Sequence, residues 1–148
     1  MANIIPNSFR GALFEANHNF KASGGNAFSL SLYVGSGSFP YTAASTVYSA
    51  TDEVSSGGSS NYAVKVLTRL GVVSSTAVAS VDFDNVTWSS ATFSAAYAAI
   101  YNTDTVDGTA NRLVVVLDFG GSKTATNGDF TITFPDPTTA SNAIISMS

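Results

Sequence analysis

Cysteine is absent from the 148-residue chain and histidine occurs once, which removes two kinds of chemistry at the outset. Without cysteine, neither disulfides nor thiolate-ligated metals hold the fold. The single histidine, His18, lies between two asparagines, and one histidine does not supply the ligands of a zinc site. A chain of this length buries roughly 70% of its unfolded surface, so its core suffices without such staples. We expect His18 to be an exposed loop residue.

Charged residues are scarce, at 11% of the chain against a typical value of about 25%. Six Lys and Arg face ten Asp and Glu, which gives a net charge of -4. Phosphate backbones are bound by clustered basic side chains, and the basic residues here are scattered singly. We therefore expect no nucleic-acid partner. The basic residues are Arg10, Lys21, Lys65, Arg69, Arg112 and Lys123.

No run approaches the roughly 18 apolar residues of a membrane span. The first residues, MANIIP, lack the basic region and apolar stretch of a signal peptide. The sequence thus predicts a soluble protein made in a cytoplasm, with no membrane partner.

Motifs of catalysis are missing as well. The chain has no Gly-x-Ser-x-Gly elbow, no phosphate-binding loop and no dinucleotide fingerprint. Carboxylates pair at Asp52/Glu53, Asp82/Asp84 and Asp104/Asp107, but strand alternation places Asp82 and Asp84 on one solvated face. The spacing of Asp104 and Asp107 differs from that of a calcium loop and favours a solvated hairpin loop. We predict that the chain is not an enzyme and takes no cofactor.

Alternation of apolar and polar residues dominates what is present, and it predicts β-strands. We expect a single domain over 1–148, an antiparallel β-sandwich of immunoglobulin-like or jelly-roll-like type with seven to eight strands. A bulge is expected near 98–99, and glycine-rich turns at 120–122 and 127–129. The expected strands are 28–33, 64–70, 78–83, 86–88, 92–101, 112–119, 129–134 and 143–147.

Several of these strands carry explicit facing predictions. The strand 28–33 should be half-buried, with its serines and Tyr33 outward. In 64–70 the apolar Val64, Val66 and Leu70 should face inward, and in 78–83 Ser80 and Asp82 should face out. The run 113–117 is apolar on both faces, as in a strand covered on both sides.

The first 20 residues predict an arm or short helix ahead of the sandwich. Asn7 or Ser8 would cap a helix reaching about Ala16, with Phe9, Ala12 and Leu13 on one face. A second segment, 46–54, is predicted to form a helical turn or an irregular crossing.

Aromatic residues number ten Phe, six Tyr and one Trp. Most fall at inward strand positions, which indicates a core role. Trp88 and Tyr97 or Tyr101 are the candidates for an exposed carbohydrate-stacking platform.

Ser, Thr, Gly, Ala and Asn fill the place of charge. Hydroxyl side chains suit exposed strand faces, which is one explanation. The other is that sister subunits or a large partner cover much of the surface. Composition leaves both open.

Several segments, taken in order, resemble a family of small structural proteins of tailed-bacteriophage virions. They are IPNSFRGAL at 5–13, FSLSLY at 28–33, YSATDEVS at 48–55, VDFDNVTW at 81–88, AAIYN at 98–102, LDFGG at 117–121 and GDFTITFP at 128–135.

The resemblance spans nearly the whole chain and implies a capsid decoration, or cement, protein. It implies binding to the major capsid protein on the capsid exterior after assembly in the host cytoplasm. Self-association is expected, as a homotrimer in preference to a dimer.

An apolar stretch ahead of the first strand could contact such a partner, or it could cap one end of the sandwich. The candidate interface is Asn3, Ile4, Ile5, Pro6, Phe9 and Arg10. Two other functions stay open: a receptor- or carbohydrate-binding module of a head or tail fibre, and a tail-tube or connector subunit.

Overall fold

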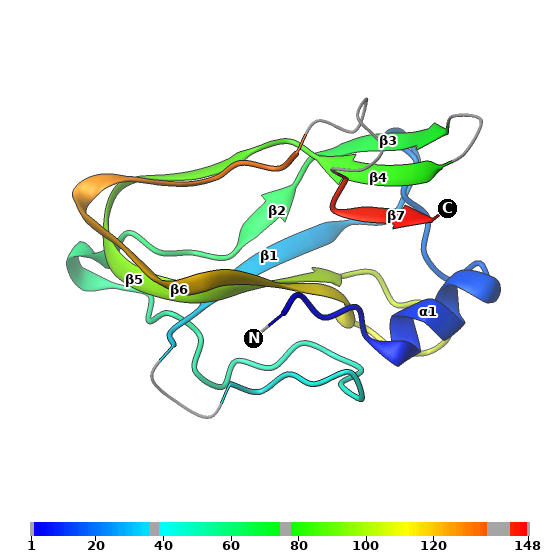
Figure 1. The fold of residues 1–148 in the computed structure, drawn as a ribbon, viewed down its shortest axis with the longest axis horizontal. Coiled ribbons are helices and arrows are strands. Elements are labelled where there is room, and N and C mark those ends of the chain that lie inside the picture. Colours follow the sequence, from blue (N-terminus) through cyan, green and yellow to red (C-terminus); the bar gives the residue numbers. More distant parts are fainter. Residues whose placement is uncertain (1, 36–38, 75–77, 136–142, 148) are drawn as a thin grey trace.

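Two antiparallel sheets and one short helix make up the computed structural model, which describes residues 2–35, 39–74, 78–135 and 143–147 (Figure 1). One sheet has the strand order β2-β1-β5-β6 and the other β3-β4-β7. The predicted all-β sandwich with a short N-terminal helix is confirmed. The elements are α1 (Asn7–Phe14), β1 (Phe28–Tyr33), the 3-10 turn η1 (Gly58–Ser60), β2 (Lys65–Leu67), β3 (Arg69–Ser74), β4 (Ala79–Phe83), β5 (Val86–Asn102), β6 (Arg112–Ile132) and β7 (Ile145–Met147).

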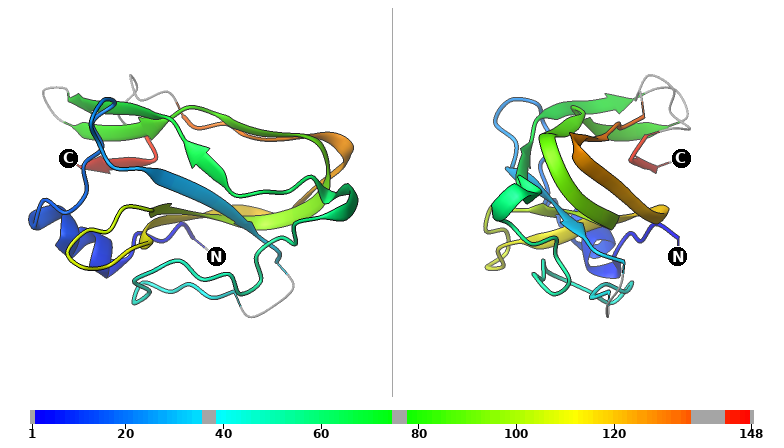
Figure 2. Two further views of the ribbon diagram at one scale, coloured as in Figure 1. Left: turned by 180° about the vertical axis from the view of Figure 1, so that it is seen from behind. Right: turned by 90° about the vertical axis from the view of Figure 1, so that its left-hand side faces the viewer.

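Strands β5 and β6 form one long hairpin where four shorter strands were predicted. The hairpin curls back on itself, so that its far half runs toward β3 and β4 (Figures 1 and 2). We call residues 97–102 and 112–118 its near half, and residues 86–95 and 123–132 its far half. The near half pairs with β1 and belongs to the four-stranded sheet.

A large bulge in β6 separates the two halves. Ala95 pairs with Lys123 and Tyr97 with Asp118, so the four residues 119–122 lie opposite Ala96 alone. Gly120 and Gly121 have φ angles of 71° and 133°, which glycine adopts without the steric cost that a Cβ would add. The turn predicted at 120–122 is therefore a bulge within a continuous strand.

Smaller register shifts occur elsewhere in the hairpin. The turn predicted at 127–129 lies inside β6, where Asn127 takes a φ of 48° at a register shift. The bulge predicted near 98–99 is displaced: shifts lie at Ala95/Tyr97 and at Ile100/Tyr101 on either side. The alternation of apolar and polar residues does not locate such insertions. Each inserted residue moves the side chains that follow it to the other face of the sheet.

Strand β1 is the centre of the core. All six of its residues are buried, so the half-buried prediction for 28–33 is wrong. Phe28, Leu30 and Leu32 belong to the main core between the sheets. Tyr33 belongs to a second cluster on the other face of the sheet, with Tyr41, Ala99, Leu113 and Val116.

The run 113–117 contributes to both clusters, as predicted for a strand covered on both faces.

The facing predicted for 64–70 is wrong. Leu67 is buried, whereas Val66 is 77% exposed. The chain leaves one sheet after β2 and enters the other at β3, so no single alternation spans the segment.

In β4, Ser80 and Asp82 are buried where an outward position was predicted. The strand is the middle one of its sheet, between β3 and β7, and Asp82 pairs with Gly71. Asp84 is exposed, so the two carboxylates do not share a solvated face.

Helix α1 ends two residues earlier than predicted and begins after Pro6, with no side-chain cap. Ser8 instead donates its hydroxyl to the carbonyl of Ser45, at 3.1 Å. Phe9 and Ala12 are buried, as the helical face predicts. The segment 46–54 is an irregular crossing that includes isolated bridges from Val47 to Arg112 and from Glu53 to Tyr33.

The bulge at residues 119–122 of β6 supplies the first testable prediction. Gly121→Ala should lower the free energy of unfolding by about 1–3 kcal/mol, because alanine is strained at a φ of 133°. Urea-induced unfolding measures the change. Gly128→Ala is the matched control in the same strand, since its φ is ordinary and its Cβ would meet only Thr126 O at 3.8 Å. Equal stability of the two variants would contradict the backbone conformation assigned to the bulge.

Candidate functional site

The N-terminal segment lies along the outer edge of β6. Ile4 forms a two-way backbone bridge with Val116, at 2.9 and 2.8 Å. Asn3 extends the contact, since its side-chain oxygen accepts a hydrogen bond from the Asp118 amide at 2.8 Å. These bonds occupy part of an edge that would otherwise present unpaired backbone groups.

The six residues predicted as an interface differ in their exposure. Pro6 and Phe9 are buried, and Ile4 and Ile5 are half-buried. Asn3 and Arg10 keep exposed side chains. A role of these residues in contacting a partner stays a prediction.

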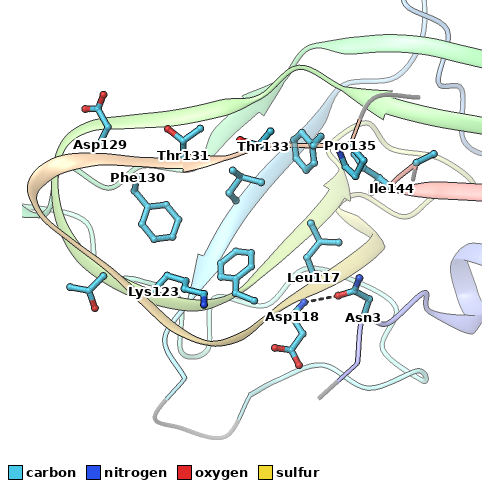
Figure 3. Close-up of a pocket in the computed structure, with 15 residues that line it drawn as sticks. Asn3, Leu117, Asp118, Lys123, Asp129, Phe130, Thr131, Thr133, Pro135 and Ile144 are labelled. Atoms are coloured by element: carbon cyan, nitrogen blue, oxygen red, sulfur yellow. Dashed lines mark hydrogen bonds between the residues drawn. The ribbon is translucent and has the colours of Figure 1, made fainter. Parts of the chain in front are cut away.

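A cleft of about 640 Å³ opens between the two halves of the curled hairpin (Figure 3). Phe130 projects into it from the far half, and Leu117 lies on the near half. Lys123 lies on the arm of β6 that precedes the reversal of the hairpin, while the carboxylate of Asp129 points away from the cleft (Figure 3). The lining of the cleft mixes apolar side chains, such as Leu117 and Phe130, with polar ones, such as Asn3 and Thr133.

A network of phenols covers the outer face of β1. The hydroxyls of Tyr33 and Tyr41 are 2.8 Å apart, and Tyr33 donates to the carbonyl of Ser49 at 2.8 Å. Glu53 accepts hydrogen bonds from Tyr48 and Tyr62, the latter at 2.5 Å. The network fastens the irregular segment 39–54 to the sheet.

Burial is the main cause of raised phenol pKa values in this network, and the Glu53 carboxylate adds to it. The pKa of Tyr101 rises to about 12, and those of Tyr48 and Tyr62 rise further. The hydroxyls therefore stay protonated and donate to Glu53 across the physiological range. Of the carboxylate pair Asp52/Glu53 noted in the sequence, Glu53 thus has a structural role as a hydrogen-bond acceptor.

Removing that acceptor tests the network. Glu53→Ala should lower the free energy of unfolding by about 2–3 kcal/mol, because hydrogen bonds to a charged acceptor are lost. Glu15→Ala is the control: the exposed Glu15 carboxylate accepts a hydrogen bond from the Asn17 side chain, and its loss should change stability by less than about 0.5 kcal/mol. Chemical denaturation of both variants measures the two changes in unfolding free energy. A Glu53→Ala protein as stable as the control would refute the assigned role.

His18 is buried, at 8% exposure, so the prediction of an exposed loop histidine is wrong. Its Nδ1 lies 3.0 Å from the Asn102 amide nitrogen, and its ring packs 5.0 Å from that of Phe9. Burial, followed by the charge of Arg112, lowers the His18 pKa to about 4. The imidazole is therefore neutral at pH 7, as a packed core group.

This lowered pKa predicts a pH dependence. The unfolded chain takes up a proton on His18 below about pH 6.5, whereas the folded chain does so only near pH 4. Stability should therefore fall as the pH falls through this window, by up to about 3 kcal/mol. Unfolding free energies of the wild type and of His18→Gln, measured across the window, give the difference. Parallel curves for the two proteins would show that His18 does not titrate as assigned.

The carboxylates of the 103–111 loop bind their own chain. Asp104 accepts from the Asn26 amide at 3.0 Å and from the Ala27 backbone at 3.2 Å. Asp107 forms an ion pair with Arg112 at 3.1 Å. Within the described ranges, no three His, Cys, Asp or Glu side chains gather in a way that could hold a metal ion.

The proposed aromatic platform does not form. Trp88 is 1% exposed and donates its ring N–H to the Ala63 carbonyl, at 2.7 Å. Tyr101 is buried, and the half-buried Tyr97 stacks on Phe39 with ring centroids 4.1 Å apart. The predicted core role of most aromatics is confirmed.

Phe14 is the exception, at 93% exposure. Sequence reasoning missed it, although its position in the helix, one after Leu13 and five after Phe9, places it off the buried face.

Hydroxyl side chains cover the outside of the far half. Thr87 and Thr131 pair across the strands at 2.9 Å, and Ser94 pairs with Thr124 at 2.6 Å. Lys123 and Asp129 are the two charged residues of this half. The hydroxyl face comprises Thr87, Ser89, Ser90, Thr92, Ser94, Thr124, Thr126 and Thr131.

Comparison of the chain with protein-family models, with curated protein sequences and with solved structures found no match. Among the described residues, no helix has the length and apolar character needed to cross a membrane.

Proposed function

We propose that the chain is a non-enzymatic capsid decoration protein of a tailed bacteriophage, bound to the outside of the major capsid lattice. The hydroxyl face of the far half carries the proposal. It is an ordered strand surface of eight Ser and Thr side chains with few neighbouring charges. Such a surface is desolvated at lower cost than a charged one, because ionised groups lose much more hydration than hydroxyls do.

The proposed attachment to the capsid relies on the many copies of the binding site in the lattice. A lattice presents the same site many times, and contacts of modest affinity add up when an oligomer engages several sites together. Strong single-site binding is then unnecessary. Attachment through a repeated surface agrees with the resemblance of the ordered sequence segments to virion structural proteins, which act through their surfaces.

Of the alternatives, a carbohydrate-binding fibre module has less support. It requires exposed aromatic rings for stacking, and Trp88 and Tyr101 are buried. A tail-tube or connector subunit would form rings on its own, which separates it from a decoration protein by native mass.

The test uses capsids of the encoding phage assembled without this protein. The purified chain should sediment with them and appear as regular extra density in electron micrographs. Thr131→Lys places a charge in the hydroxyl face and should lower capsid occupancy by at least about tenfold, as for a central interface position.

Thr105→Lys is the matched control, because Thr105 is exposed in the loop between β5 and β6, outside the hydroxyl face. It should bind as the wild type does. Failure of the wild type to sediment with capsids would overturn the proposed function. Rings formed by the protein alone would favour the tail-tube alternative. Equal binding of Thr131→Lys and the control would remove the hydroxyl face as the contact.

A further inference from the structure

One asparagine of the chain, Asn127, is followed by glycine, and it lies where the β5–β6 hairpin reverses. The reversal falls between Lys123 and Asp129 of β6 (Figure 3). Every other asparagine precedes a residue that carries a side chain. The difference matters chemically, because the backbone nitrogen that follows an asparagine attacks its carboxamide most readily when no side chain stands beside that nitrogen.

The carboxamide of Asn127 is open to solvent. Asn127 is exposed, and its side chain makes no hydrogen bond with the described residues. Its backbone N–H donates to the Thr92 hydroxyl at 2.9 Å, a bond that leaves the carboxamide unengaged. Asn26 shows the contrast, since its amide donates to the Asp104 carboxylate at 3.0 Å. The side chain of Asn127 is therefore available to its own backbone.

The backbone around Asn127 is less regular than the rest of the hairpin. Gly128 pairs with Ala91, and the next pair of the ladder lies at Phe93–Ala125, after a register shift. Asn127 lies between these pairs and has a left-handed φ of 48°. Closure of a ring between the side chain and the next backbone nitrogen requires rotation about the Asn127 Cα–C bond. The space beside that bond is open, because a Cβ built on Gly128 would meet one backbone oxygen, at 3.8 Å.

We propose that Asn127 is a site of succinimide formation, through which the far half of the hairpin gains a negative charge. The backbone nitrogen of Gly128 bonds to Cγ of Asn127, the bond from Cγ to the side-chain nitrogen breaks, and ammonia leaves with the Gly128 amide proton. Water then opens the five-membered ring. Cleavage between the ring nitrogen and Cγ gives aspartate. Cleavage between the ring nitrogen and the backbone carbonyl carbon gives isoaspartate, which adds one methylene to the main chain.

The new carboxylate would lie beside the hydroxyl face. Asn127 follows Thr126 of that face, and its backbone contacts Thr92 of the same face. The far half holds one cation, Lys123, and one anion, Asp129, so its net charge changes from zero to -1. An ionised group loses much more hydration than a hydroxyl when a partner covers it, so the product should bind the capsid lattice less well. This consequence rests on the proposed function, whereas the reaction itself does not.

The intact mass of the purified protein, followed during incubation at physiological temperature and mildly alkaline pH, tests the reaction. The wild type should gain about 1 Da as an amino group is replaced by a hydroxyl, and about 3 Da in water labelled with oxygen-18. Peptide mapping should place the gain at Asn127, with isoaspartate among the products. Isomerisation of aspartate at the Asp107–Gly108 pair adds no mass in ordinary water, so the gain reports asparagine.

Two variants should slow the gain, and a third is their control. Asn127→Gln requires a six-membered ring, and Gly128→Ala places a Cβ beside the attacking nitrogen. Asn111→Gln should gain mass at the wild-type rate. Asn111 is the matched position because it is also exposed and left-handed, with a φ of 57°, but it precedes Arg112.

Sedimentation with capsids measures the consequence for binding. Aged wild type and fresh Asn127→Asp should each show capsid occupancy at least about fivefold lower than fresh wild type, at the lower end of the cost of burying an unpaired polar group. Aged Asn127→Gln should bind as the fresh variant does.

A constant wild-type mass, or a gain that maps to another asparagine, would overturn the inference. A gain at Asn127 that leaves occupancy unchanged would overturn its link to the capsid contact. If fresh wild type does not bind capsids while the gain still maps to Asn127, the proposed function is overturned and the modification site stands.

Discussion

The rest of the structure depends on the reversal of the long β5–β6 hairpin. The reversal lies between Lys123 and Asp129 of β6 (Figure 3), where the register shifts between Ala91 and Phe93 and Asn127 has a φ of 48°. Because of this turn, one hairpin joins β1 with its near half and carries its far half toward β3 and β4 (Figure 1). The cleft between the halves and the hydroxyl face on the outside both arise from it. A straight hairpin of this length would leave much of its apolar face in water.

A second constraint is the covering of β1 on both faces. The main core covers one face, and the tyrosine network fastens segment 39–54 over the other. Glu53 is central to this cover because one carboxylate receives two phenol hydroxyls. The arrangement gives an irregular segment a fixed position without a disulfide, through hydrogen bonds whose donors burial keeps protonated.

A feature could be predicted from the sequence when it depends on residues close together in the chain, and not when it depends on distant ones. Local alternation located β1, the near half of β6 and the buried face of α1, because each depends on residues close together in the chain. The bulge at 119–122 was predicted as a turn, since two glycines after an apolar run indicate a turn unless the partner strand is known. His18, Asp82 and Val66 were placed on the wrong side because their burial is set by segments distant in the sequence. The exposed ring of Phe14 was missed for a related reason: the pattern of a short helix identifies the residues that it buries, and Phe14 is not one of them.

The scarcity of charge bears directly on the proposed capsid contact. Lys123 and Asp129 are the two charged residues of the far half, and the rest of its exposed surface is mainly hydroxyl side chains. Covering such a surface costs little hydration free energy, because hydroxyls lose far less hydration than ionised groups do. An oligomer that presents this face more than once would engage several lattice sites, and each further contact is strengthened by its high effective concentration. A surface of modest affinity is therefore sufficient for firm attachment when it is repeated.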